Sequence, residues 1–148
     1  MKSEKVNRDP KIEKRNMTIK EITIAVIIHL IIPTIGIFLF LKLIAKMKSD
    51  NIIHPPILEF FIIFATYGGL LLVMLTSIFW KWSGLASLGT FYLILGAPIL
   101  LGFITYHQFK KRKISKYHNW AFQTSIFYYL IAPSLALIIY LTEPKWIH

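Results

Sequence analysis

PILEFFIIFATYGGLLLVMLTSIF, residues 56–79, is the stretch of sequence that decides the fold. Its single charged residue is Glu59, and apolar residues would cover every side of the helix it forms. A helix that crosses a bilayer needs about 20 mainly apolar residues, because hydrocarbon offers the backbone no hydrogen-bond partner. A water-soluble helix would instead keep one polar face. The stretch therefore predicts a transmembrane helix.

Three further stretches of the same character lie at residues 22–43, 84–109 and 120–141. The mean hydropathy of the chain is +0.58, and 55% of its 148 residues are hydrophobic. The longest segment outside these spans is a polar, basic tail over residues 1–20. It is too short to form a hydrophobic core of its own. We therefore predict an all-α integral membrane bundle of four transmembrane helices over residues 21–148. We expect the helices to run up and down, with the short polar tail before them.

The chain has no cysteine, which excludes disulfides, thiol catalysis and cysteine-ligated metals. Its net charge is +10, and the basic residues lie in the tail and in the connections between spans. Lysine and arginine at these places meet anionic lipid headgroups, so we expect the lipid bilayer as a partner and no nucleic acid. The densest basic cluster, our predicted anionic-lipid contact, comprises Lys110, Lys111, Arg112, Lys113 and Lys116.

The basic residues do not fix the orientation in the membrane. In a four-span arrangement, nine of them fall on the side of the tail and eight on the opposite side. The positive-inside rule places the side with more lysine and arginine in the cytoplasm, and nine against eight is no clear excess on either side. The isoleucine- and lysine-rich composition is typical of AT-rich bacterial genomes, so we expect a multi-pass protein of the bacterial cytoplasmic membrane.

Pro33, Pro98 and Pro133 lie inside predicted spans. Proline lacks a backbone N–H, and its ring collides with the carbonyl four residues earlier, so each is expected to bend its helix. Neighbouring helices commonly satisfy the freed carbonyls in membrane proteins. The other interpretation is that the three bends open a polar cavity inside the membrane.

His29 is the residue that such a cavity would involve. It lies about four residues, roughly 6 Å at 1.5 Å per residue, from the middle of its span. An ionisable side chain inside a membrane suggests a functional site, although it also serves as a hydrogen-bonding contact between helices. At similar depth in the third and fourth spans lie hydroxyl groups. The predicted polar layer is His29, Thr90, Tyr92 and Ser134.

A second predicted site lies at the opposite end of the spans. Glu59 is in the first turn of its helix, where the helix dipole favours a carboxylate. Lys42 and His107 are expected at the same depth and complete a candidate interfacial ion cluster. The sequence permits either a structural ion pair or the entrance to a gated pathway.

Small residues in the third span, namely Ser83, Ala86, Ser87 and Thr90, recur at the four-residue spacing that lets helices approach closely. No catalytic or phosphate-binding motif is present, and we expect neither a cofactor nor a metal. The leading hypothesis is a non-catalytic accessory, assembly or structural membrane subunit that binds another membrane protein or a second copy. The alternative is a protomer of an oligomeric small-solute or ion transporter or channel that uses the layer around His29. An enzyme is the least favoured class.

Overall fold

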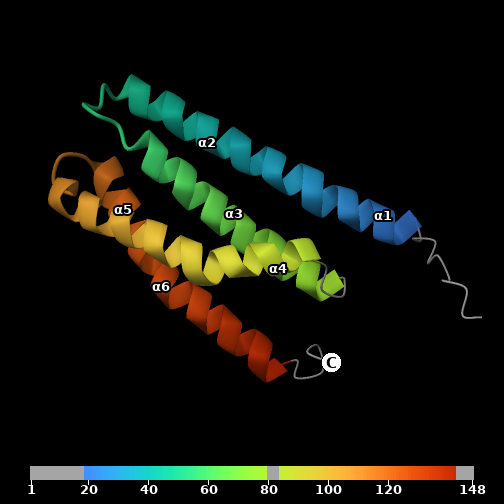
Figure 1. Cartoon of the computed structure of the whole chain (residues 1–148). Coiled ribbons are helices and arrows are strands. Elements are labelled where there is room, and N and C mark those ends of the chain that lie inside the picture. The colour runs from blue at the N-terminus through green and yellow to red at the C-terminus, as the bar shows by residue number, and fades with distance from the viewer. Residues whose placement is uncertain (1–18, 80–83, 143–148) are drawn as a thin grey trace, which may run out of the picture.

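The computed structural model describes the backbone of residues 19–79 and 84–142, and the side chains of 19–76, 88–138 and 141 (Figure 1). The predicted tail lies almost entirely outside these residues, as do the side chains of Ser83, Ala86 and Ser87. In the described ranges there is no strand, and the chain folds as an all-α bundle, which confirms the predicted fold class. The elements are α1 (Ile19–Val26), η1 (Ile27–Ile31), α2 (Ile32–Ser49), α3 (Ile57–Phe79), α4 (Gly84–Phe91), η2 (Tyr92–Gly96), α5 (Ala97–Lys111) and α6 (Lys116–Thr142).

These elements build four helices that are long and apolar enough to cross a membrane. The first helix consists of α1, η1 and α2 without interruption, and the third consists of α4, η2 and α5. The first helix continues to Ser49, six residues past the predicted end of its span. Lysine is a good helix former and its long side chain reaches the headgroup level, so Lys46 and Lys48 extend the helix rather than end it.

The helices run up and down, as Figure 1 shows. The connections over residues 50–56 and 112–115 lie together at one end of the bundle, which we call the loop end. The first helix packs against α3, α3 also contacts the third helix and α6, and α5 and α6 form the most extensive contact. The first helix is the outermost and least buried of the four.

Two of the three prolines follow a π-helical turn. The turn η1 ends two residues before Pro33, and η2 ends two residues before Pro98. In each turn the N–H of the residue just before proline bonds five residues back, Ile32 to Ile27 and Ala97 to Tyr92. A wider turn accommodates the missing donor and the bulky ring. Pro133 lies within α6, which is α-helical on both sides of it.

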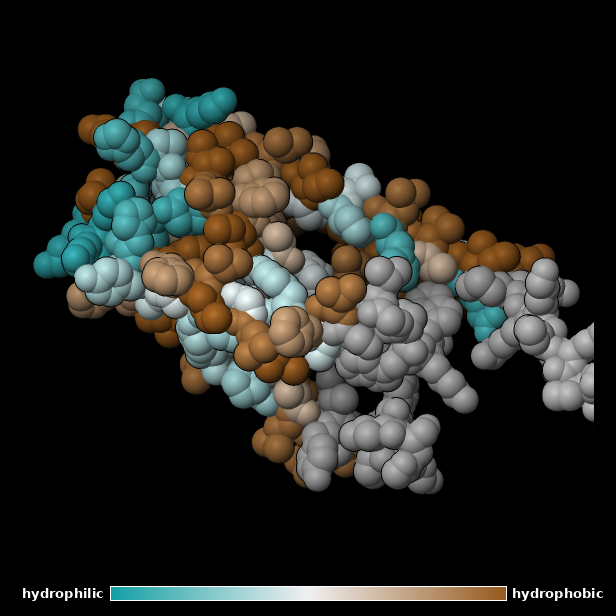
Figure 2. Space-filling view, in the orientation of Figure 1, coloured by the Kyte–Doolittle hydropathy of each residue, from teal (hydrophilic) through white to brown (hydrophobic). Residues whose placement is uncertain are grey.

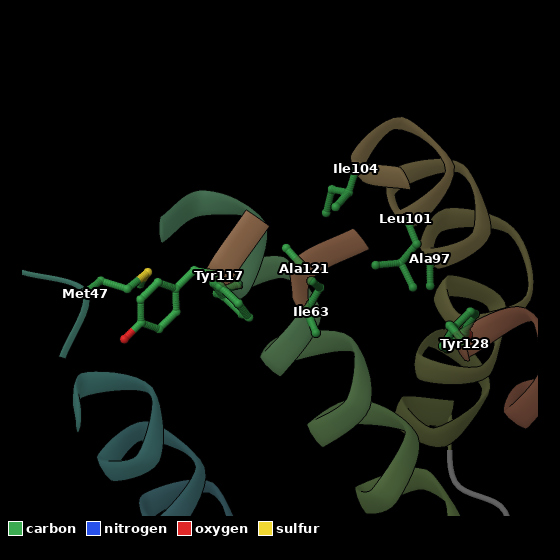
Figure 3. Packing of buried hydrophobic residues seen from close by; sticks show 9 residues of the cluster. Met47, Ile63, Ala97, Leu101, Ile104, Tyr117, Ala121 and Tyr128 are labelled. Atoms are coloured by element: carbon green, nitrogen blue, oxygen red, sulfur yellow. The ribbon is translucent and has the colours of Figure 1, made fainter. Parts of the chain in front are cut away.

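The buried core lies mainly toward the loop end, where α5 and α6 pack on α3. Figure 3 shows Tyr117 beside Met47 of the first helix, and Ala121 beside Ile63. Tyr117, Met47 and Leu101 are completely enclosed. Along the spans many large apolar side chains are exposed, as a bilayer requires. Figure 2 accordingly shows brown along the helices and teal at the loop end.

Candidate functional site

Glu59 is the centre of the polar cluster at the loop end. Its Oε1 accepts a hydrogen bond of 2.8 Å from Gln108 Nε2 and lies 3.3 Å from His107 Nδ1. The carboxylate is largely enclosed, with 18% of the Glu59 side chain exposed against 54% for His107. The predicted neighbours Glu59 and His107 are therefore brought together across α3 and α5. Lys42, the other predicted member, forms no ion pair with a carboxylate in the described part of the chain.

Gln108 completes this cluster and was missed by the sequence prediction. Its side chain is buried, and its Oε1 has no hydrogen-bond partner among the described residues. Gln108 stands four residues after Ile104 and seven after Leu101, both buried, so it belongs to the inward face of α5. No signal in the sequence identifies it, because apolar residues surround this helix and only the structure shows which face is inward.

Asp50, Tyr117 and Lys116 form a second polar contact at the loop end. Tyr117 donates a hydrogen bond of 2.6 Å to Asp50 Oδ2, and Lys116 Nζ lies 3.0 Å from the same oxygen. The Tyr117 hydroxyl, followed by the Lys116 ammonium, holds the pKa of Asp50 below its usual value of 3.8. The contact ties the end of α2 to the beginning of α6. The sequence predicted Asp50 only as part of a turn, over residues 49–51, after the lysine-rich end of the first helix.

Ser115 explains why α6 begins four residues before its predicted start. It lies directly before Lys116, the first residue of α6, and the backbone N–H of His118 points to its Oγ at 3.4 Å. The same Oγ is 2.7 Å from His118 Nδ1. Serine at this position supplies an acceptor for an otherwise unpaired helix donor. The cap and the buried His118 ring hold this connection in place.

The basic cluster lies at the end of α5 and the start of α6. Three of its members stand over aromatic rings: Lys110 is 4.8 Å from the centre of the Tyr106 ring and Arg112 is 4.3 Å from that of Phe109. Lys116 is 5.1 Å from the Tyr117 ring. The three cations keep these positions by cation–π attraction at the level expected for headgroups. Their contact with lipid remains a prediction.

Three of the four members of the predicted polar layer have the following partners. His29 Nδ1 lies 3.0 Å from the Ala25 carbonyl oxygen, within its own helix. The hydroxyl of Ser134 donates to Leu130 O, also within its helix, at 2.6 Å. Tyr92 pairs with Thr66 of α3 at 3.0 Å. His29 and Ser134 are exposed on their helices. A shared layer around His29 remains a prediction.

Four further hydroxyl groups inside the spans donate hydrogen bonds to a neighbouring helix. Tyr67 donates to Thr124 O at 2.7 Å, joining α3 to α6. Thr105 donates to Ser125 Oγ at 2.8 Å, and the buried Tyr128 hydroxyl donates to Leu93 O at 2.7 Å. A further bond runs from Tyr129 to Pro98 O. Bonds of this kind hold membrane helices in register.

Within the described part of the chain, no three His, Asp, Glu or Cys side chains are placed to hold a metal ion. No family model, no curated protein and no solved structure matches this chain. The fold and its four apolar helices define a small multi-pass membrane protein.

Proposed function

We propose that this small membrane protein is a non-catalytic accessory or assembly subunit, whose exposed helix faces contact another membrane protein. The observation that carries the proposal is that several hydroxyls inside the spans are used in bonds between helices, such as Thr66 to Tyr92 and Thr105 to Ser125, while others bond a carbonyl of their own helix, as Ser134 does. A solute pathway or a catalytic centre would need polar groups that face a cavity. The two hollows beside the first helix are lined mainly by apolar side chains.

The composition and the charge distribution support the location of this subunit. Isoleucine- and lysine-rich usage favours a bacterial cytoplasmic membrane, and the cluster around Lys110 and Arg112 is suited to anionic headgroups. The outermost position of the first helix leaves a long apolar face for a partner.

Photocrosslinking in native membranes tests the accessory role. Because the chain has no cysteine, single cysteines at Phe38 or Phe103, which are 64% and 70% exposed, take a benzophenone maleimide without background. Thr66→Cys, at a buried position, is the matched control. We expect an adduct of one fixed mass, larger than the chain and distinct from a homodimer, from an exposed position and none from the control. Adducts of twice the chain mass alone, with solute uptake by the reconstituted protein, would contradict the proposal.

The second candidate is a transporter or channel protomer, and the π-helical turn around His29 is the observation that favours it. Turns of this type are frequent at functional sites, and an exposed histidine in an outer helix could line a pathway shared between copies. In that case His29→Leu abolishes solute flux in proteoliposomes and leaves the helical circular dichroism unchanged. If the protein is an accessory subunit, neither the natural chain nor His29→Leu conducts solute, and His29→Leu still folds.

A further inference from the structure

The first helix does not close against α3 along its whole length. A Cβ atom at Gly36 or at Gly68, which both lie in this contact, would meet nothing within 4 Å. Hollows of about 320 Å³ and about 390 Å³ lie on the two faces of the contact, and both are lined by these two glycines. Figure 2 shows an opening between the first helix, at the upper edge, and the rest of the molecule.

The larger hollow is an apolar groove between three helices. It is lined by Ile35 and Leu39 of the first helix, by Ile63, Tyr67 and Leu71 of α3, and by Thr124 of α6. The polar atoms closest to the groove already form a hydrogen bond with each other, because the Tyr67 hydroxyl donates to the Thr124 carbonyl at 2.7 Å. A buried water needs two to four polar partners, so the groove favours an apolar occupant. Its volume is within the range of small-molecule sites, about 300–1,000 Å³.

Basic side chains continue the groove toward the loop end. Ile35, Leu39, Lys42 and Lys46 follow one another at spacings of four, three and four residues, so they share one face of the helix. At 1.5 Å per residue, Lys42 and Lys46 begin about 4.5 Å and about 10.5 Å beyond Leu39. Both lysines are exposed.

The opposite wall of the groove has a matching pattern on α6. Trp120 stands four residues before Thr124, and Lys116 four residues before Trp120. The indole is 43% exposed, and tryptophan favours the level of the lipid headgroups. We call the end of the groove at the loop end its mouth. Asp50 is the carboxylate at this mouth, and it is bound by Tyr117 and Lys116.

Glu59, the nearby carboxylate of α3, is turned to the third helix. Its Oε1 receives the side chain of Gln108 and contacts that of His107, both in α5. The mouth therefore contains three lysines and one carboxylate, that of Asp50, so its net charge is +2. The lysines are Lys42, Lys46 and Lys116.

We propose that this groove binds one anionic phospholipid, with an acyl chain between the first helix and α3 and the phosphate between Lys42 and Lys46. The groove and its mouth match the two parts of a lipid that lies along the helices. The apolar wall of the groove lies within the membrane and suits an acyl chain, and the lysines and the Trp120 indole lie at the level of the headgroup. The site shares only Lys116 with the basic cluster and does not depend on a protein partner.

Lipid retention by the purified chain in detergent tests the site. Native mass spectrometry measures how much dioleoyl phosphatidylglycerol or dioleoyl phosphatidylcholine stays bound during dilution. We expect one phosphatidylglycerol per chain, and the double variant Lys42→Gln, Lys46→Gln to bind it about 25-fold more weakly, at about fivefold per lysine near an anionic surface. The matched control Lys20→Gln, Lys48→Gln removes the same charge from the first helix, with Lys20 at its other end and Lys48 off the face that Lys42 and Lys46 share, and should leave retention unchanged.

A second variant tests the acyl-chain half of the site. Gly36→Leu places a side chain in the open contact and should abolish retention without loss of helical circular dichroism. Equal losses in the two lysine variants would overturn the proposal in favour of general attraction to the basic surface, as would equal retention of phosphatidylcholine. A photoreactive group at Leu39 that couples to protein rather than to lipid in native membranes would show that a helix of a partner or a second copy occupies the groove.

Discussion

Asp50 accepts two contacts at one oxygen, from Tyr117 at 2.6 Å and from Lys116 at 3.0 Å. Both favour the charged carboxylate and lower the pKa of Asp50 in the folded protein below 3.8, its value in an unfolded chain. The resulting stabilisation is complete above that value and is lost as the pH falls through the lowered folded-state pKa. We expect Asp50→Asn to lower the melting temperature at neutral pH, and the difference to shrink below pH 3.8 and to vanish below the lowered folded-state pKa. Melting followed by circular dichroism in detergent measures it, and a difference that persists undiminished in strong acid would contradict the assignment.

Gly96 lies against an aromatic ring of its own helix. A Cβ at this position would stand 2.8 Å from Cδ2 of Tyr92, whose hydroxyl pairs with Thr66. We expect Gly96→Ala to displace the ring and destabilise the protein by about 1–3 kcal/mol, the usual cost of overpacking. Gly69→Ala is the control, because its Cβ would meet nothing within 4 Å, and alanine favours a helix by about 0.5–1 kcal/mol over glycine. Unfolding in mixed micelles measures both, and equal stabilities of the two variants would refute the close contact.

At the scale of the element, the start of α6 depends on Ser115. Its Oγ lies 3.4 Å from the His118 backbone N–H and 2.7 Å from His118 Nδ1. Ser115→Ala removes the cap and should cost about 0.5–2 kcal/mol, whereas Ser115→Asp keeps an acceptor and most of the stability. Amide hydrogen exchange should rise in the first turn of α6 in the alanine variant alone. Unchanged exchange there would mean that packing, rather than the cap, begins the helix.

The π-helical turn η2 is the element that places Tyr92. We expect Pro98→Ala, which restores a backbone donor, to return Tyr92–Gly96 to an α-helix and to rotate Tyr92 away from Thr66. Tyr92→Phe should then cost about 0.6 kcal/mol in the natural chain and nothing in the Pro98→Ala background. The double-mutant cycle measures this coupling. Pro133→Ala is the control, because no π-helical turn lies in α6 before Pro133, and there the cost of Tyr92→Phe should persist.

At the scale of the whole molecule, the up-and-down arrangement fixes which connections share a side of the membrane. Cysteines at Ile53 and Ile114, which are 75% and 61% exposed at the loop end, should react with an impermeant maleimide from the same side. A cysteine at Ile19, 84% exposed at the other end, should react only from the opposite side. Labelling of intact and permeabilised cells measures this and also gives the orientation. Reaction of Ile53→Cys and Ile114→Cys from different sides would contradict the four-span count.

The sequence by itself determined the class of fold and the approximate position of every span, because a bilayer admits few backbone structures and marks each span with a long apolar run. It also placed Glu59 and His107 at one depth, since the rise per residue of a helix is fixed. The helix ends were less certain: capping by Ser115 and the helix-forming lysines near Ser49 extend the helices beyond their apolar runs.

Only the tertiary structure decided which side chains meet. Depth is set by position along a helix, but contact also depends on the rotation of each helix and on the choice of neighbour, and no pattern in an all-round apolar span specifies these. Tyr92 therefore faces Thr66 of α3, Glu59 binds Gln108, and Asp50 joins Tyr117. The π-helical turns before Pro33 and Pro98 alter the rotation further, because each adds one residue to its turn.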